Sequence, residues 1–404
     1  MAVRETHPST STDDRTDSAR APAWLIGLLA VAAGTTVANL YYNQPLLPAI
    51  AVSFGVDERA AGGIPVVTQL GYGLGMIAVV PLGDRVERRR VIVGMTALAA
   101  VALLAVAAAP SLGWLLAASL ALGLASMVPQ AIVPYAAGIA HPTERGRVVG
   151  NVMSGLLIGI LLSRTVSGLV GARLGWQAMY VISAGSMLAL AVVLRVLLPP
   201  QSPERRVPWG ELYRSVLTLV RTEPVLQQHA FLGALTFAAF SLFWSTLAFH
   251  LAALPQHWGS GVAGAFGVVG VAGALAAPLV GRFADQRDPR IINGAALATV
   301  ALSFVVLGLG GGSLLGLGLG VILLDLGAQA NHISNQTRIF GLDAALRNRL
   351  NTAYMALYFA GGAFGSWLGT TVYARFAWPG VCVAGALLGV IGFSFFIARV
   401  APRG

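Results

Sequence analysis

The sequence predicts an all-α membrane protein with twelve transmembrane helices in two pseudo-symmetric six-helix bundles. Three observations lead to this prediction. Of the 404 residues, 56% are hydrophobic and only 10% are charged, whereas charged residues make up about a quarter of a soluble domain. Apolar stretches of about 20 residues, long enough to cross a bilayer as a helix, alternate with short polar or glycine-rich breaks. Finally, loop motifs of the first half recur in the second.

The predicted elements follow one another along the chain. Residues 1–21 are polar and rich in Ser, Thr, Asp and Arg, which predicts a disordered cytoplasmic tail. The apolar stretches cover residues 24–49, 63–83, 91–109, 112–138, 148–171, 176–197, 229–252, 260–281, 291–309, 313–334, 350–373 and 377–398. Pro129 and Pro134 are expected to bend the fourth stretch.

These stretches fall into two groups of six. We expect an N-terminal six-helix bundle at 22–198, a cytoplasmic linker at 199–228 and a C-terminal six-helix bundle at 229–400. The linker has the pattern of an amphipathic helix that lies on the cytoplasmic surface of the bilayer. The apolar residues on one face of that helix are Trp209, Leu212, Val216, Leu219 and Val220.

The distribution of basic residues predicts the orientation. All 26 of them are arginines, and the net charge is +10, which in a soluble protein would suggest nucleic-acid binding. Here 22 arginines fall on one side of the predicted membrane, and only Arg59, Arg173 and Arg375 fall on the other. Because cytoplasmic loops carry the excess of positive charge, we expect both termini to be cytoplasmic. We expect no nucleic-acid partner.

Residue types also exclude several kinds of chemistry. Without lysine, the chain cannot form a lysine Schiff base or the phosphate-binding loop that ends in Gly-Lys-Ser/Thr. The single cysteine, Cys382, cannot form an intrachain disulfide or a cysteine metal centre. The acidic residues are dispersed along the sequence and suggest no catalytic cluster. We therefore expect no cofactor, no metal site and no enzyme activity.

The two halves of the sequence repeat each other. Asp84 and Asp285 are 201 residues apart, and the run RLGW at 173–176 recurs as RFAW at 375–378, which is 202 residues later. An offset of six spans preserves orientation. The halves are therefore expected to be parallel repeats about an axis along the membrane normal.

The loop after the second span carries a family motif. Its run LGDRVERRR, at 82–90, resembles the signature Gly-x-Leu-Ala-Asp-Arg-x-Gly-Arg-Arg of the major facilitator superfamily, and GRFAD at 281–285 repeats it. The resemblance covers residues 22–400 and implies the major facilitator fold. It also implies a conformational lock, in which a carboxylate binds guanidinium groups in one conformation and releases them in another. The residues assigned to this lock are Asp84, Arg85, Arg88, Arg89 and Asp285. The alternative is a basic loop with an incidental acid.

The end of the first span restricts the family resemblance to a subgroup of the superfamily. The run ANLYYNQP, at 38–45, is similar to twelve-span drug:proton antiporters, and within them to bacterial exporters of the sugar and purine-ribonucleoside efflux group. Gly150, Gly159 and Gly168 match the antiporter pattern of the fifth span, whereas Arg164 stands where that pattern has proline. The resemblance implies export of a small organic solute in exchange for protons.

Asp325 is the acidic residue that lies deep in a predicted span, about 18 Å from the outer end of the tenth. On a helix it shares one face with Gln329, His332 and Gln336. Ionisable side chains at this depth are costly and are functional candidates by default. We assign proton coupling to Asp325 and His332. The alternative is a static aspartate that bonds to neighbouring groups.

Arg164 is the basic residue inside a predicted span. It lies about 6 Å below the outer surface, so its long side chain could extend to that surface or lock neighbouring helices. The alternative role is attraction of an anionic or carboxylate-bearing substrate. Because its depth differs from that of Asp325 by about 12 Å, we do not expect the two to form an ion pair.

Other predicted cavity residues are neutral. Aromatic rings beside amides suit a moderately polar, ring-shaped solute that can stack and form hydrogen bonds. Together with Arg164, the residues assigned to the substrate cavity are Asn39, Tyr42, Gln69, Tyr72, Gln130, Phe240, Trp244, Gln329, Asn351 and Tyr354.

Glycines recur every four residues in three of the spans, a spacing that allows close helix contacts. They are Gly71 and Gly75 in the second span, Gly155 and Gly159 in the fifth, and Gly361, Gly365 and Gly369 in the eleventh. The family resemblance implies that these spans meet between the halves. The alternative is static packing.

Together these features predict a secondary active transporter of the inner membrane that works by alternating access. Its expected activity is proton-coupled efflux of a small organic solute such as a drug, sugar or nucleoside. An uptake symporter of the same fold is the first alternative, and a membrane-embedded enzyme or a non-transporting sensor is a weaker one. The expected partners are the solute, protons and the lipid bilayer, and we expect a monomer.

Overall fold

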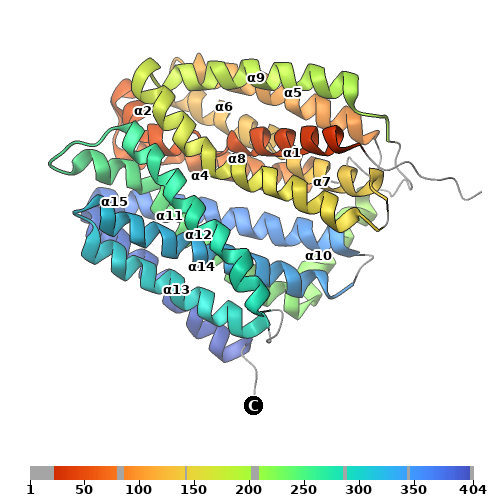
Figure 1. Ribbon diagram of the computed structural model, residues 1–404. Coiled ribbons are helices and arrows are strands. Elements are labelled where there is room, and N and C mark those ends of the chain that lie inside the picture. The colour runs from red at the N-terminus through yellow and green to blue at the C-terminus, as the bar shows by residue number, and fades with distance from the viewer. Residues whose placement is uncertain are drawn as a thin grey trace, which may run out of the picture.

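Helices form the regular structure of the computed structural model, which describes residues 22–79, 86–141, 143–201, 209–284, 289–343 and 346–400. No strand occurs within these ranges, which confirms the all-α prediction. Figure 1 shows the helices of the first half, coloured from red to yellow, above those of the second half, coloured from green to blue. The long helices run side by side.

The elements of the first half are α1 (Ala23–Ala38), η1 (Gln44–Leu46), α2 (Leu47–Phe54), α3 (Glu58–Ala61), α4 (Gly63–Val79), α5 (Arg88–Ala107), α6 (Leu112–Ala125), α7 (Val128–Ile139), α8 (Arg145–Leu174) and α9 (Trp176–Leu197). Those of the second half are α10 (Trp209–Thr222), α11 (Pro224–Ala253), α12 (Ser260–Ala284), α13 (Pro289–Gly310), α14 (Leu314–Phe340) and α15 (Arg347–Arg399).

Eight helical segments of the described residues are long and apolar enough to cross a membrane. They are α5, α6 continued by α7, α8, α9, α11, α13, α14 and α15. α15 contains both the eleventh and the twelfth predicted spans. The full count of twelve spans stays a prediction.

The first predicted span, 24–49, is wrong as a single helix. α1 ends at Ala38, and a turn leads from it into η1 and α2. Pro45 contributes to the break, because proline lacks the N–H that a continuing helix needs, whereas Pro48 lies in the first turn of α2, where a helix tolerates it.

The expected bend in the fourth span is confirmed. α6 ends at Ala125, and α7 begins at Val128, immediately before Pro129. Pro134 lies inside α7. The break therefore stands where proline removes a backbone donor from the helix.

The repeated loop motif has the same unusual backbone in both halves. Gly175, between α8 and α9, has φ 84° and ψ 161°, and its counterpart Ala377 within α15 has φ 50° and ψ −152°. This region of backbone space is essentially restricted to glycine and costs a residue with a Cβ about 1–3 kcal/mol. Trp378 supports the second kink, since its Nε1 donates to the carbonyl of Leu307 at 3.0 Å and its ring stacks on His250 with centroids 4.0 Å apart.

Exchanging the two residues tests this strain. Ala377→Gly is expected to raise the free energy of unfolding by about 1 kcal/mol, and Gly175→Ala to lower it by at least as much. Both changes are read from the thermal unfolding midpoint of the purified protein in one detergent. Equal shifts of the same sign would contradict the assignment of strain to Ala377.

Most helix packing occurs within each half. α1 lies against α8, α4 against α6, and α5 against α9, while in the second half α11 lies against α15 and α13 against α14. The glycine faces named above serve these contacts. A methyl group on Gly75 would stand 2.7 Å from the carbonyl oxygen of Leu124 in α6, and one on Gly369 would stand 2.8 Å from that of Leu242 in α11. Gly155 faces Ala30 of α1 in the same way.

The expectation that these spans meet between the halves is confirmed, since the halves meet mainly where α8 lies against α12 and α4 against α15. The glycine faces just described, in contrast, pack within each half. Between α8 and α12, a methyl group on Gly264 would stand 3.0 Å from Cα of Gly168. Oγ1 of Thr165 donates to the carbonyl of Gly264 at 2.9 Å, and Oγ of Ser260 donates to that of Gly168 at 3.2 Å. We call this contact the α8–α12 seam.

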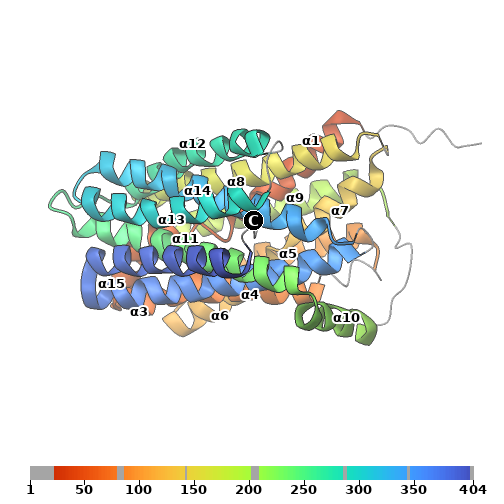
Figure 2. The same ribbon diagram turned by 90° about the horizontal axis from the view of Figure 1, so that it is seen from below.

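The linker helix α10 is attached to the second half. Val216, Leu219 and Val220 pack against the hydrophobic core, and Nη1 of Arg349 donates to Oγ of Ser215 at 2.7 Å. Figure 2 shows α10 at one end of the molecule. Part of the predicted apolar face is thus covered by protein, and its position on the bilayer surface stays a prediction.

Candidate functional site

Arg164 of α8 points into the centre of the protein. Its side chain is completely buried, with an exposed fraction of 0%, so the expectation that it extends to the outer surface is wrong. Nε donates to Oε1 of Gln44 at 2.6 Å. The guanidinium carbon lies 4.0 Å from the ring centre of Trp244, 4.8 Å from that of Tyr41 and 5.4 Å from that of Phe240. A cation surrounded by aromatic faces is stabilised by their quadrupoles without leaving the interior.

Asp325 of α14 also lies near Trp244. It is 1% exposed, and a methyl group added to Gly270 of α12 would stand 2.6 Å from its Oδ2 and 3.7 Å from Cζ2 of Trp244. A residue larger than glycine there would force the carboxylate to shift. Burying an ionisable carboxyl group at this position costs free energy, because the charged form loses its hydration. Packing alone does not require Asp325 here.

Arg164 and Asp325 attract each other electrostatically but form no ion pair. All ion pairs between described side chains involve Glu87 or Glu144, in agreement with the expectation from their depths. Nη2 of Arg164, Oδ2 of Asp325 and Nε1 of Trp244 are buried without a hydrogen-bond partner. A donor and an acceptor of opposite charge therefore remain available near one indole ring.

The space beside Arg164 is narrow. It is lined by Gln44, Pro45, Arg164, Trp244, Leu247, Ala248 and Ala263, and it leaves no room for a solute. Helices η1, α8 and α11 must therefore separate locally before a solute can reach the guanidinium.

Four of the predicted cavity residues form hydrogen bonds, and three of these, Gln69, Gln130 and Asn351, bond across the two halves. Nε2 of Gln130 donates to the hydroxyl of Tyr72 at 3.1 Å, and Nδ2 of Asn351 donates to Oε1 of Gln130 at 3.4 Å. Nε2 of Gln69 donates to Oγ of Ser366 at 3.1 Å. These contacts connect α4 and α7 of the first half with α15 of the second.

His332 is not next to Asp325. It lies seven residues further along α14, or about 10 Å, and its Nδ1 is 3.0 Å from the hydroxyl of Tyr354. An aromatic row connects the two places: His332 lies 4.7 Å from Tyr358, which stacks on Phe237 at 4.1 Å. Phe237 is followed by Phe240 at 5.8 Å, and Phe240 by Trp244 at 6.0 Å.

Three predicted cavity residues lie away from Arg164 or make no described contact with it. Asn39 is buried against α9, where its Nδ2 points to Sδ of Met187 at 3.5 Å, and Tyr42 is buried near the same helix. Gln329 is half-buried on α14. The structure thus brings Arg164, Phe240, Trp244 and Asp325 together and places the other candidates around them.

Two features of this region carry little signal in the sequence. Gln44, which binds Arg164, lies within the run ANLYYNQP of the first span. Its place in that run is the only sign in the sequence that it belongs to the site. The second feature is a closed ring of amides. Nδ2 of Asn293 donates to Oδ1 of Asn335 at 2.6 Å, Asn335 donates to Asn331 at 2.8 Å, and Asn331 donates back to Asn293 at 2.5 Å. Nδ1 of His229 lies 2.8 Å from Oδ1 of Asn335.

The predicted conformational lock is described only in part. Asp84, Arg85 and Asp285 lie outside the described residues. Arg88 approaches the carbonyl of Pro134 at 3.5 Å. Arg89 donates to the carbonyl of Leu198 at 3.0 Å.

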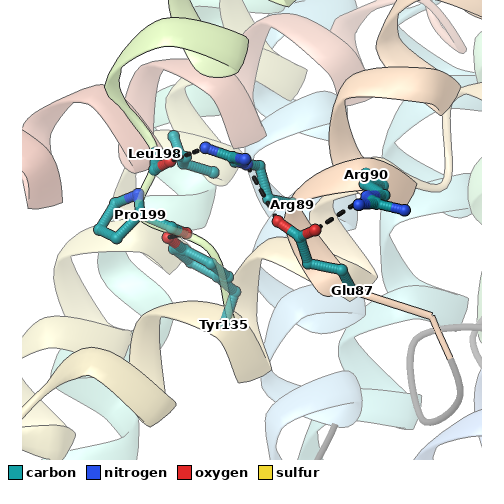
Figure 3. Close-up of polar contacts among 6 residues, drawn as sticks. All are labelled: Glu87, Arg89, Arg90, Tyr135, Leu198 and Pro199. Carbon is teal, nitrogen blue, oxygen red and sulfur yellow. Dashed lines mark hydrogen bonds and ion pairs between the residues drawn. The ribbon is translucent and has the colours of Figure 1, made fainter. Parts of the chain in front are cut away.

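Figure 3 shows this basic cluster beside the end of α9. Glu87 accepts from Arg89 at 3.1 Å and from Arg90 at 2.8 Å. The hydroxyl of Tyr135 donates to the carbonyl of Pro199 at 2.8 Å. The start of α5 is thereby tied to α7 and to the end of α9, all within the first half.

Known proteins resemble the chain over most of its length. It is 42% identical over 367 residues to the uncharacterized transporter YgaY of Escherichia coli O157:H7, covering 91% of this chain and 93% of that protein. Over 152 residues, 37% of each chain, it is 32% identical to the 3-(3-hydroxy-phenyl)propionate transporter of Escherichia coli (strain K12).

A solved structure has the same fold. The crystal structure of a bacterial homolog of the human lysosomal transporter Spinster, inward-facing and unoccupied, superposes with a TM-score of 0.72 at 14% identity, covering 94% of this chain and 98% of that one. The sequence profile of the Major Facilitator Superfamily matches residues 25–342. The chain therefore belongs to the Major Facilitator Superfamily of membrane transporters.

Proposed function

We propose that this chain is a secondary active transporter of the inner membrane that exports a small, ring-bearing organic solute in exchange for protons. The observation that carries the proposal is the pair of buried, unpartnered polar atoms beside one indole ring, Oδ2 of Asp325 and Nη2 of Arg164. A solute that stacks on Trp244 would donate a hydrogen bond to Asp325 and accept one from Arg164.

This arrangement would account for the exchange of solute for protons. A proton on Asp325 and the donor group of a solute compete for the same carboxylate, so binding of one weakens binding of the other. Arg164 belongs to α8 and Asp325 to α14, and these helices come from different halves. Alternating access about the site would expose the carboxylate first to one side of the membrane and then to the other, as two bundles at 22–198 and 229–400 rock against each other. Asp84, Arg85, Arg88, Arg89 and Asp285 are proposed to lock one of the two states.

A proton-coupled uptake symporter is the second candidate. An anionic solute that used Arg164 alone would be repelled by ionised Asp325, and it would bind better once that carboxyl carried a proton. Proton and solute would then travel together. The name of one relative supports this alternative, because 3-(3-hydroxy-phenyl)propionate is an aromatic carboxylate.

Uptake into proteoliposomes separates the two candidates. An antiporter accumulates solute in vesicles that are acidic inside, and a symporter in vesicles that are alkaline inside, whichever way the protein is inserted. The panel contains an aromatic amine, an aromatic carboxylate and a nucleoside, with protein-free vesicles as control. Weak acids collect passively in the alkaline compartment, so accumulation of the carboxylate in acidic vesicles requires the protein.

We expect accumulation in acidic vesicles. Accumulation only in alkaline vesicles would replace export by symport. If neither gradient drove uptake of any panel member, the transport proposal would fail, and a membrane-embedded enzyme or a non-transporting sensor would be favoured.

A further inference from the structure

Gly270 of α12 lies at a point where three helices of the second half meet. A methyl group on it would stand 2.6 Å from Oδ2 of Asp325 in α14 and 3.7 Å from Cζ2 of Trp244 in α11. Asp325 is 1% exposed, and its Oδ2 is buried without a hydrogen-bond partner in the described part of the chain. The carboxylate therefore occupies the space that any larger side chain at position 270 would take.

The same helix also contacts the second charged residue of the site. Gly267 lies three residues, or about 4.5 Å, before Gly270 in α12. It faces α8, where a methyl group on it would stand 3.1 Å from Cβ of Arg164. α12 thus touches Arg164 through one glycine and Asp325 through the next. These two glycines set how closely each charged residue approaches α12, and with it the gap between the unpartnered Nη2 of Arg164 and Oδ2 of Asp325.

The backbone of α12 does not require a glycine at position 270. The residue lies inside a helix, where glycine is less favourable than alanine. Gly261 of the same helix shows the contrast, because a methyl group on it would stand 3.7 Å from Cβ of Ala172, an ordinary contact. The close approach of the Asp325 carboxylate is what distinguishes Gly270.

We propose that Gly270 is a positioning residue that determines which solutes the site selects. Because it has no side chain, Oδ2 of Asp325 can lie against α12, at the distance from Arg164 that a bound solute must span. Gly270 would thereby favour ring-bearing solutes with a hydrogen-bond donor over solutes that offer only a carboxylate. The inference rests on the proposed function, since it requires that the solute donates a hydrogen bond to Asp325.

A methyl group at position 270 would displace the carboxylate. A carbon atom and a carboxylate oxygen in ordinary contact stand about 3.3–3.6 Å apart, so in Gly270→Ala the oxygen must move by roughly 1 Å. Oδ2 is the free end of its side chain, and its movement lets the variant fold. Solutes that donate to Asp325 should bind about tenfold more weakly, the loss typical of one hydrogen bond to a charged group. Solutes held by Arg164 alone should bind as before.

The test measures binding to full-length protein in neutral detergent, without a pH gradient. Benzylamine and uridine are the probes with a donor group, and benzoate is the probe with only a carboxylate. Affinity is read from the shift of the thermal unfolding midpoint with probe concentration, and the midpoint without a probe shows whether each variant is folded. We expect Gly270→Ala to weaken binding of benzylamine and uridine about tenfold and to leave binding of benzoate unchanged. A general loosening of α12 would weaken all three.

Three further variants assign the effect to the carboxylate. Gly261→Ala is the matched control in the same helix and should bind every probe as the wild type does. In an Asp325→Ala background the methyl group displaces no carboxylate, so Gly270→Ala should change the affinities no further. Asp325→Glu moves the carboxylate by one methylene without a change in α12, and it should reproduce the selective loss even if Gly270→Ala does not fold.

The outcomes separate this role from the proposed function. If the wild type binds neither benzylamine nor uridine, the hydrogen bond to Asp325 fails, and the role of Gly270 fails with it. If the wild type binds either probe and Gly270→Ala binds it equally well, or loses benzoate to the same extent, Gly270 has no positioning role while the proposed function stands. The same holds if Gly270→Ala weakens binding as much in the Asp325→Ala background as in the wild type.

Discussion

Asp325→Asn is expected to abolish accumulation of solute driven by a pH gradient. The amide keeps the size of the carboxyl group and its hydrogen-bonding capacity, but it cannot change charge. For exchange of one proton per solute, a difference of about 2 pH units can drive a concentration ratio of about 100 in the wild type. In Asp325→Asn that ratio should fall to the level of protein-free vesicles. Exchange of labelled for unlabelled solute without a gradient should continue, because the ring stack on Trp244 remains.

Asp57→Asn provides the matched control for this loss. Asp57 is exposed and caps α3 by accepting from the amide of Ala60 at 2.8 Å, a role that asparagine also fills. It should leave the gradient-driven ratio unchanged. If Asp325→Asn accumulated solute with the same dependence on the pH gradient as the wild type, Asp325 would not be the proton carrier.

Arg164→Gln is expected to weaken solute binding by roughly 10- to 100-fold, the range for losing a hydrogen bond to a charged group in a buried site. The measurement is the solute concentration that gives half-maximal exchange. Arg164→Lys keeps a charge but loses the planar set of donors, so its effect should be intermediate. The loss should be largest for solutes that carry a carboxylate.

Arg173→Gln controls for the general effect of removing an arginine from α8. Arg173 is exposed in the last turn of the same helix, and its variant should bind solute normally. A thermal unfolding midpoint in detergent shows whether Arg164→Gln is folded. A folded Arg164→Gln protein with unchanged affinity for every solute would restrict Arg164 to a structural role.

Much of the fold follows from the sequence because membrane spans and loop breaks are local properties. The repeat of RLGW as RFAW predicted two equivalent corners, and Gly175 and Ala377 have the same backbone conformation there. Pro129 predicted the interruption between α6 and α7. Pro45 and the polar residues Asn39, Asn43 and Gln44 carried information about the break after Ala38, but the total length of the apolar stretch favoured one helix.

The site was less predictable, because periodicity identifies which residues share a helix face but not what that face meets. Counting residues placed Arg164 near the outer surface, yet its side chain extends inward, where Gln44 and Trp244 bind it. The direction of a long side chain depends on partners from other helices, and no local pattern reveals them. The same reason explains why the glycine spacing predicted close helix contacts but not which helix each glycine face meets. Asn331 and Asn335 are four residues apart, a signal that the deeper Asp325 obscured.

The α8–α12 seam has a consequence for the speed of the conformational cycle. At Gly168 and Gly264 the two helices touch through backbone atoms, so no side chain at these two positions obstructs a change in their crossing angle. The hydroxyl groups of Thr165 and Ser260 would exchange one carbonyl acceptor for another. Movement at the seam should therefore meet a low activation barrier. The slow step of turnover would then lie elsewhere, in opening the tightly packed aromatic contacts around Trp244.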